Sequence, residues 1–194
     1  MLLAEPPTQT DGRRRRSQQS RDRIIAAMMA LVEEGQTSPI AEQVAERAQV
    51  GLRSVFRHFN DMDSLFAEMA ARLALHYQPA LAPFVSQDWR GRLNEAVERR
   101  IAIYEKLLPY KRAADTHRHA SPAIQSNHAQ TNQLLRARLR SLLPPALVDN
   151  AMALETLDYL LSVDSWQRLR IEQNLPVETA RAIIEAQLKA CLEA

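Results

Sequence analysis

The sequence predicts an all-α protein. Only four glycines occur among its 194 residues, and the breaks in its second half fall instead at prolines, which end helices. Apolar residues recur three and four positions apart, the spacing of one helix face. No stretch alternates β-branched and polar residues between turn signals, so we expect no strand.

Residues 1–16 are predicted to form a disordered basic arm. They contain Pro6, Pro7 and Gly12 and end in the run of Arg13–Arg16, a composition that cannot bury a core. Residues 1–60 carry nine Lys or Arg against seven Asp or Glu, whereas residues 61–194 carry 16 of each. Such a run attracts a polyanion with a strength that falls as salt rises, although a solvated tail explains the run equally well.

The first helix is expected from about Ser17 to Glu34. Ile24, Met28 and Leu31 recur on one face and give an apolar stripe, and Gly35 supplies a stop signal. A helix with one apolar face needs partners to pack against.

Two short helices follow. Ser38 and Pro39 are typical of an N-cap and a first helical position, and the apolar residues of 41–48 recur at helical spacing. After a break at residues 49–51, a second helix over 52–60 would bury Val55 and Phe59 and expose Arg53, Ser54 and Arg57.

This pair predicts a helix-turn-helix, whose second helix lies in the DNA major groove. There, Arg donates two hydrogen bonds to guanine and apolar side chains touch the thymine methyl group. Leu52, Arg53 and Ser54 occupy the end that would reach the bases. A helical hairpin that only packs would explain Val55 and Phe59, but not the outward arginines.

Residues 24–73 resemble the DNA-binding domain of the TetR (tetracycline-repressor-like) family, in the stretches AAMMALVEEG, AEQVAERAQV and GLRSVFRHFNDMDSLFAEM. The Phe-Arg-His-Phe run at 56–59 is similar to that family's Tyr-x-His-Phe element. The resemblance implies that Ser54, Phe56 and His58 lie at or near the DNA backbone, with Leu52 and Arg53 nearest the bases. The DNA-binding residues predicted in total are Arg13, Arg14, Arg15, Arg16, Ser38, Leu52, Arg53, Ser54, Phe56, Arg57 and His58.

The sequence departs from the family pattern at four positions. Gln49 stands where glycine is usual, and Gly51 stands where Ser or Thr is usual, so the turn is built differently and lacks one side-chain cap. Phe56 replaces the usual Tyr and has no hydroxyl to donate to a phosphate, and Met62 occupies a position that is commonly basic.

The rest of the chain is predicted to be helical as well. A fourth helix, capped by Asp61 or Asp63, would run to Pro79. Further helices are expected near 89–107, 111–119, 122–142, 146–174 and 177–193. We thus expect a helix-turn-helix domain over 17–61 and a helical ligand-binding and dimerisation domain over 62–194.

The last two predicted helices are unusually apolar for surface helices. The resemblance implies that they form a four-helix bundle with a second copy of the chain. Packing wholly inside one subunit is the alternative. The predicted interface residues are Leu154, Leu161, Ala180, Ile183, Ile184, Leu188 and Leu192.

The resemblance also implies a small-molecule effector pocket among the helices of residues 62–174. Its candidate residues are polar or aromatic side chains within apolar helices, for each of which an ordinary core role is the alternative. They are Tyr77, Tyr104, His117, Asn127, His128, Asn132, Asp158 and Trp166. No metal site is predicted, because His117 and His119 point to different sides of a helix.

No catalytic or phosphate-binding motif is present, so we expect neither an enzyme nor a cofactor. The chain has a single cysteine and no apolar run long enough to span a membrane, and its opening residues MLLAEPPTQT have neither a basic start nor a long apolar stretch. These features indicate a cytoplasmic protein without a membrane partner. The sequence predicts a homodimeric regulator of transcription that binds double-stranded operator DNA, acts as a repressor and responds to an effector. The effector could instead recruit DNA. The alternative is a helical dimeric small-molecule-binding or interaction protein with a degenerate DNA-binding module.

Overall fold

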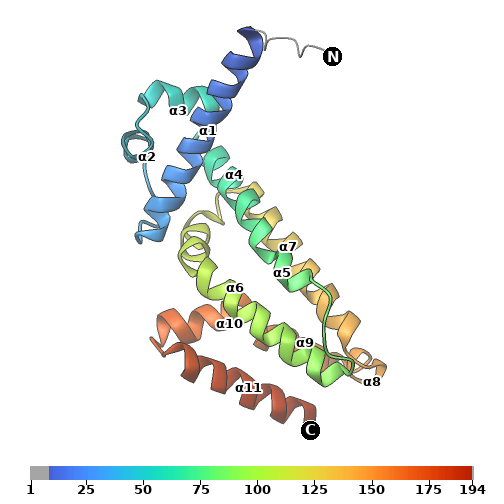
Figure 1. The fold of residues 1–194 in the computed structure, drawn as a ribbon. Helices are drawn as coiled ribbons and strands as arrows, with labels where there is room; N and C mark the ends of the chain where they lie inside the picture. The colour runs from blue at the N-terminus through green and yellow to red at the C-terminus, as the bar shows by residue number, and fades with distance from the viewer. Residues whose placement is uncertain (1–8, 194) are drawn as a thin grey trace, which may run out of the picture. The chain divides into compact units, whose positions relative to one another are not determined.

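The computed structural model describes residues 9–193, with side chains from residue 12 onward. This part of the chain consists of helices and the loops between them, without a strand, as predicted (Figure 1). The elements in chain order are α1 (Gln9–Glu33), α2 (Ala41–Arg47), α3 (Leu52–His58), α4 (Met62–Ala74), the 3₁₀ helix η1 (Leu75–Tyr77), α5 (Gln78–Leu81), α6 (Trp89–His117), α7 (Pro122–Leu142), α8 (Pro145–Val148), α9 (Ala151–Leu160), α10 (Val163–Gln167), the π-helix η2 (Arg168–Glu172) and α11 (Val177–Glu193).

The described chain divides into two compact units. Unit 1 comprises residues 9–71 and Pro109–Ile124, and unit 2 comprises Arg72–Leu108 and residues 125–193. The division falls inside α4, α6 and α7, so these three helices contribute residues to both units.

The core of unit 1 forms where α1, α2, α3 and α4 bury their apolar faces. The predicted stripe of α1 is buried, with Ile24 and Met28 completely inaccessible to solvent. Val44 of α2 and Val55 of α3 are buried as well, at 0% and 1% exposure. Phe59, the residue after α3, is also buried. Val55 and Phe59, which the sequence predicts to be buried, thus lie inside.

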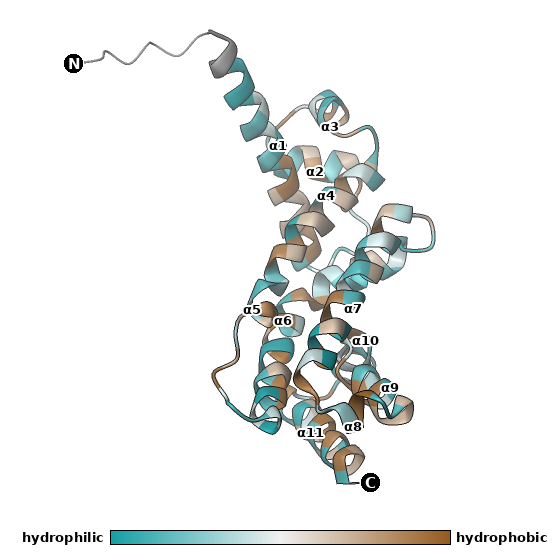
Figure 2. Cartoon of the chain, turned by 90° about the vertical axis from the view of Figure 1, so that its right-hand side faces the viewer, coloured by the Kyte–Doolittle hydropathy of each residue, from teal (hydrophilic) through white to brown (hydrophobic). Residues whose placement is uncertain are grey.

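The first helix begins earlier than predicted. Arg13–Arg16 are helical rather than disordered, because α1 starts at Gln9. Arginine is a good helix former, and the Arg16 Nε donates to the backbone oxygen of Gly12 within the same turn at 3.2 Å. The helix start is strongly hydrophilic and its residues from 12 to 19 are exposed (Figure 2). Residues 1–8 of the predicted arm lie outside the described part of the chain.

The turn between α2 and α3 depends on a left-handed residue. Gln49 has a φ of 53°, and it follows α2 in the position that glycine usually occupies. The Gln49 N–H donates to Glu46 O and the Val50 N–H donates to Ala45 O, both at 3.0 Å, so α2 ends in a Schellman motif. α1 ends in the same way around Gly35, whose φ is 98°. The predicted stop at Gly35 is confirmed.

Helix starts in unit 1 depend on local caps. The prediction that Ser38 and Pro39 start α2 is wrong. The N-cap residue is Ile40, whose N–H donates to Gln43 Oε1 at 3.0 Å. The predicted cap at Asp61 is confirmed, because its Oδ1 accepts the Ser64 N–H at 2.8 Å.

Three predicted helix boundaries are wrong. Pro109 does not separate two helices, because α6 continues through it with buried Leu107, Leu108 and Tyr110 on both sides. The single helix expected over 146–174 is broken into α8, α9, α10 and η2. Asn150 and Ser162 are the N-caps of α9 and α10. Their side-chain oxygens accept the backbone N–H of Ala153 and of Ser165, each at 3.1 Å. The fourth helix ends at Ala74, and η1 and α5 carry the chain past Pro79.

Candidate nucleic-acid interface and ligand pocket

Helix α3 buries one face and presents the other to solvent. Val55 is buried, whereas Leu52 and Phe56 are 38% and 47% exposed, and Arg53 and Arg57 are exposed as well. Two large apolar side chains in water are unusual on so short a helix, and they alternate here with two cations. Such a face suits the thymine methyl groups and guanine edges of a major groove.

Arg21 of α1 fixes the far end of α3. Its Nη1 donates to the backbone oxygen of His58 at 3.0 Å, and its Nη2 donates to Glu68 Oε2 of α4 at 2.8 Å. The guanidinium carbon also lies 4.5 Å from the centroid of the Phe59 ring. One side chain therefore joins α1, α3 and α4. Sequence reasoning missed Arg21, although its position is in register with the stripe of Ile24 and Met28.

The predicted backbone contacts lie beside this anchor. Ser54 is half-buried, and its hydroxyl accepts from Arg57 Nη2 at 3.3 Å. His58 is half-buried, and its Nε2 is buried without a hydrogen-bond partner. Burial, and then the charges of Arg57 and Arg21, lower the pKa of His58 below its usual value, so its ring is neutral near pH 7. Ser38 is exposed, in the loop before α2.

The four arginines of α1 cannot all face one surface. They are exposed and consecutive in a regular helix, in which successive side chains point about 100° apart around the axis. A duplex approaching from one side would meet about two of them. The structure therefore reduces the number of contacts that the predicted arm can make at once.

Three predicted effector residues, Tyr104, Asn132 and Asp158, line one pocket of about 280 Å³ in unit 2. The Tyr104 hydroxyl donates to the backbone oxygen of Leu161 at 2.8 Å, and burial raises its pKa to about 12. The remaining lining residues are Arg100, Leu135, Glu155, Tyr159, Leu161, Ser162 and Asp164.

The other candidate effector residues do not line this pocket. Tyr77 belongs to η1 of unit 2, and burial, with smaller contributions from Tyr104 and Asp164, raises its pKa. Trp166 is buried and donates its Nε1 to Glu105 at 2.8 Å, which is an ordinary core role.

Three more candidates lie elsewhere. His117 belongs to unit 1, where its ring centroid lies 4.2 Å from that of Phe66. Asn127 and His128 are half-buried on α7 but are not among the residues lining the pocket, and His128 Nε2 lies 3.1 Å from Asn132 Nδ2. His128 lies one turn before Asn132 on the same face of α7, so it is next to the pocket without lining it, whereas Asn127 lies on another face.

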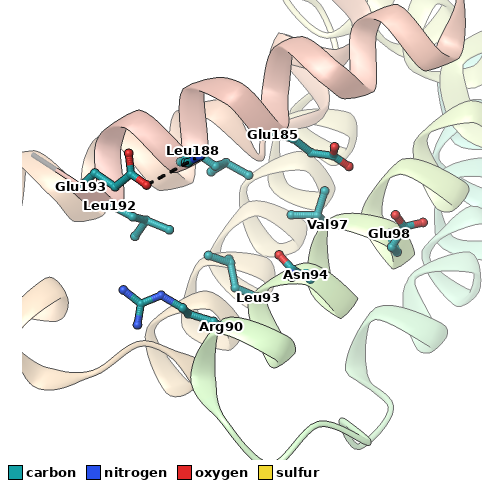
Figure 3. Close-up of a pocket in the computed structure, with 10 residues that line it drawn as sticks. Arg90, Leu93, Asn94, Val97, Glu98, Glu185, Leu188, Leu192 and Glu193 are labelled. Atoms are coloured by element: carbon teal, nitrogen blue, oxygen red, sulfur yellow. Dashed lines mark ion pairs between the residues drawn. The ribbon is translucent and has the colours of Figure 1, made fainter.

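A second hollow lies between α6 and the end of α11, with a volume of about 500 Å³ (Figure 3). Leu93 and Val97 of α6 face Leu188 and Leu192 of α11 across it, with charged residues around the rim. Lys189 Nζ and Glu193 Oε1 form an ion pair of 3.9 Å at that rim. The hollow is a surface groove in which Leu192 is half-buried, whereas Leu188 is only 5% exposed.

Most of the predicted dimer stripe is buried by the chain itself. Leu154, Leu161, Ala180, Ile184 and Leu188 are at most 5% exposed within the single chain, because α11 packs against α9 and η2 and along α6. Their burial therefore does not require a second copy, as in the alternative of packing inside one subunit, and their role in a dimer stays a prediction. Ile183, at 37% exposure, and the half-buried Leu192 stay accessible.

Two negative findings concern the described residues. None of their helices is long and apolar enough to cross a membrane. Within the same part of the chain, no group of three or more His, Cys, Asp or Glu side chains is placed to hold a metal ion.

No protein-family model and no curated protein matches the sequence. Solved structures match the fold. A proposed transcriptional regulator from Pseudomonas aeruginosa PAO1 has a TM-score of 0.68 at 18% identity, with 88% of each chain covered. A transcriptional regulator from Rhodococcus sp. Rha1 has a TM-score of 0.67 at 18% identity, covering 90% of this chain and 96% of that one. A proposed TetR-family transcriptional regulator from Rhodococcus sp. has a TM-score of 0.61 at 16% identity, covering 89% and 98%. The chain thus has the all-α fold of these regulators, the fold that its resemblance to the TetR family predicts.

Proposed function

We propose that this protein is a DNA-binding regulator of transcription that reads double-stranded DNA with α3. The observation that carries the proposal is the exposed face of α3, on which Leu52, Arg53, Phe56 and Arg57 stand in solvent while the opposite face is held in the core. A short helix that is fixed on one side and offers cations and apolar groups on the other suits base readout in the major groove. The fold shared with transcriptional regulators supports the same function.

The contacts divide into two kinds. Arg53 and Leu52, at the start of α3, are the candidates for base edges. Phe56 and the arginines of α1 are the candidates for the sugar-phosphate backbone, which attracts cations without regard to sequence. Phe56 can only pack there, since it has no hydroxyl group.

The protein acts as a homodimeric repressor whose operator affinity depends on an effector in unit 2. Two copies related by a twofold axis place two α3 helices on two half-sites of a duplex. The exposed side of α11 at Ile183 is the surface for the second copy. Helix α6 supports coupling, since it holds Arg100 and Tyr104 of the pocket and continues as one helix to His117 of unit 1. An effector that favours one conformation shifts the affinity for DNA by linkage.

Selection of duplexes from a random library by the full chain tests the proposal. We expect one sequence, with two related half-sites, to be enriched. Replacing Arg53 by Ala should weaken binding to that duplex by about 1–3 kcal/mol and should change binding to random duplexes much less. Without any enrichment, the DNA-binding proposal fails, and a helical small-molecule-binding or interaction protein with a degenerate DNA-binding module becomes the better description.

A further inference from the structure

The start of α1 continues the helix face that bonds to α3. Arg21 donates to the backbone oxygen of His58, the last residue of α3, at 3.0 Å. The exposed residues 12–19 precede it in the same helix, and both views show this end of α1 projecting past α3 (Figures 1 and 2). A regular helix turns about 100° per residue, so Arg14, seven residues earlier, points within about 20° of the direction of Arg21. Arg14 is therefore directed toward the α3 side of α1.

Arg16 is directed away from α3. It lies five residues before Arg21, which turns its side chain by about 140° from that of Arg21. Its Nε donates to the backbone oxygen of Gly12 at 3.2 Å, so one of its donors is used within α1. Arg14 and Arg16 are thus two exposed cations of the same helix that point about 160° apart. A partner on one side of α1 meets one of them and not the other.

Four side chains, which we call the α1 patch, line a shallow hollow on this part of the helix. They are those of Arg14, Arg15, Ser17 and Gln18. The two guanidinium groups, the hydroxyl and the amide all donate hydrogen bonds, and none of the four carries negative charge. The Gln18 amide donates to Asp22 Oδ1 at 3.2 Å and keeps a second hydrogen for another acceptor. The α1 patch is therefore positive and rich in donors, without an apolar side chain.

These properties match the phosphates of a nucleic-acid backbone. A guanidinium fork pairs with a phosphate through two parallel hydrogen bonds, and hydroxyl and amide groups donate to phosphate oxygens as well. The side of α1 that carries Arg14 faces α3, whose Leu52 and Arg53 are proposed to enter the major groove. The two phosphate backbones border that groove. A duplex on α3 thus brings phosphates to the α3 side of α1, and not to the side that carries Arg16.

We propose that the α1 patch binds backbone phosphates of the duplex that α3 reads, with Arg14 as the main contact and Arg16 left in solvent. The inference rests on the proposed function, because it assigns the partner of α3 to a second surface of the same unit. The patch belongs to a regular helix, so its chain does not have to be ordered on binding, as a disordered arm would. The contact adds affinity without reading the sequence.

Arg14→Gln and Arg16→Gln form a matched pair, because each removes one charge from an exposed side chain of α1. Their affinities for the duplex selected from the random library are measured by fluorescence anisotropy over a range of salt concentrations. At about 0.15 M salt, Arg14→Gln should bind at least about fivefold more weakly than wild type, and its slope of log affinity against log salt should be shallower by about one. Arg16→Gln should bind within about twofold of wild type and keep the slope.

This comparison separates a direct contact from general attraction. Both variants have the same net charge, and exposed charges more than about 8 Å apart are largely screened at that salt concentration. Equal losses in the two variants, or a greater loss in Arg16→Gln, would overturn the assignment of the face. Circular dichroism should show the helix content of wild type in both variants, since neither side chain is buried.

A phosphate contact also predicts equal effects on every sequence. Arg14→Gln should weaken binding to the selected duplex and to random duplexes by the same factor, in contrast to Arg53→Ala. A loss confined to the selected duplex would show that Arg14 reads a base, and it would contradict the phosphate assignment.

Neutral methylphosphonate groups, placed one at a time in the selected duplex, locate the phosphate. Wild type should lose at least about threefold in affinity at one or two positions at which Arg14→Gln loses nothing further, because the removed charge and the removed side chain belong to the same contact. If wild type and Arg14→Gln respond alike at every position, Arg14 contacts no phosphate and the inference is wrong.

The same measurements distinguish this inference from the proposed function. If a duplex is enriched, and wild type, Arg14→Gln and Arg16→Gln bind it equally, the α1 patch is a solvated helix surface and the DNA-binding function stands. If no duplex is enriched, the proposed function itself fails, and the inference fails with it.

Discussion

The guanidinium of Arg21 donates a hydrogen bond of 3.0 Å to the backbone oxygen of His58, the last residue of α3. Carbonyl groups at a helix C-terminus have no partner inside the helix and carry partial negative charge. Arg21 of α1 supplies both a hydrogen-bond donor and a positive charge to this helix end. Glu68 of α4 accepts a second hydrogen bond from the guanidinium at 2.8 Å. The orientation of α3, the helix proposed to read DNA, thus depends on a residue that bonds to α3 and α4 and is not itself proposed to contact DNA.

Replacing Arg21 by Ala should weaken both folding and DNA binding. The Arg21 and Glu68 side chains are each about one-third exposed, so solvent screens their ion pair. The charged hydrogen bond to His58 is the larger contribution. We expect the free energy of unfolding in urea to fall by about 1–2 kcal/mol. Affinity for the selected duplex, measured by fluorescence anisotropy, should fall as well.

Glu68→Gln is the control for this change, since it removes the ion pair and leaves the bond between Arg21 and His58. Its effect on stability should stay below about 1 kcal/mol, with little effect on DNA affinity. Equal losses in the two variants would show that Arg21 acts only through Glu68.

Gln49→Gly should stabilise unit 1. Gln49 has a φ of 53° in the turn between α2 and α3, a conformation in which a side chain with a Cβ is strained and glycine is not. The strain relieved exceeds the greater freedom of glycine in the unfolded chain, so we expect a gain of about 0.5–1 kcal/mol. The midpoint of urea unfolding should rise while its slope stays unchanged.

Asn174 offers a matched comparison in unit 2, with a φ of 51°. Asparagine tolerates the left-handed region better than glutamine, so Asn174→Gly should give a smaller gain. A loss of stability in Gln49→Gly would show that the side chain makes a contact worth more than the strain.

Local features could be predicted from the sequence, because they depend on residues close together in the chain. The stop at Gly35, the cap at Asp61 and the stripe through Ile24 and Met28 are of this kind. The partners of Arg21 are 37 and 47 positions away, and a single sequence does not show which carbonyl an arginine will reach. Arg100 was missed for the same reason, since its carbonyl partners are 35 and 61 positions away.

The wrong boundaries have two different causes. Pro109 removes one hydrogen bond from α6, but the packing of neighbouring residues such as Leu108 and Tyr110 outweighs that loss. Asn150 and Ser162 were signals present in the sequence, since both residue types are preferred caps, and they break the apolar stretch after 146 into separate helices. For α11, periodicity predicts a buried face without specifying which chain buries it.

Acidification should destabilise unit 1 through His58. Its pKa in the folded chain is lowered, first by burial and then by Arg57 and Arg21, whereas the unfolded chain has the ordinary value of about 6.5. The neutral ring's contribution to stability is therefore fully present above that pH, and it is lost as the pH falls through the lowered value. We expect wild type to lose more unfolding free energy than His58→Gln between about pH 7.5 and about pH 5.5.

The exposed His119, in the same unit, provides the control. His119→Gln removes an exposed histidine from the same unit and leaves His58 and its surroundings in place. If both variants have equally shallow profiles, the acid sensitivity does not come from burial of His58.

Ile183 and Ile184 are neighbours on α11 with opposite environments, at 37% and 4% exposure. Ile183→Glu adds a charge to the surface proposed for the second copy, so the dimer should dissociate while the unfolding free energy of the subunit changes by no more than about 0.5 kcal/mol. Ile184→Glu places an unpaired carboxylate in the core of unit 2, and it should destabilise the chain by roughly 3 kcal/mol or more. Sedimentation and urea unfolding distinguish the two effects. A wild-type chain that sediments as a monomer at micromolar concentration contradicts the dimer, and an Ile183→Glu variant that stays dimeric moves the interface to another surface.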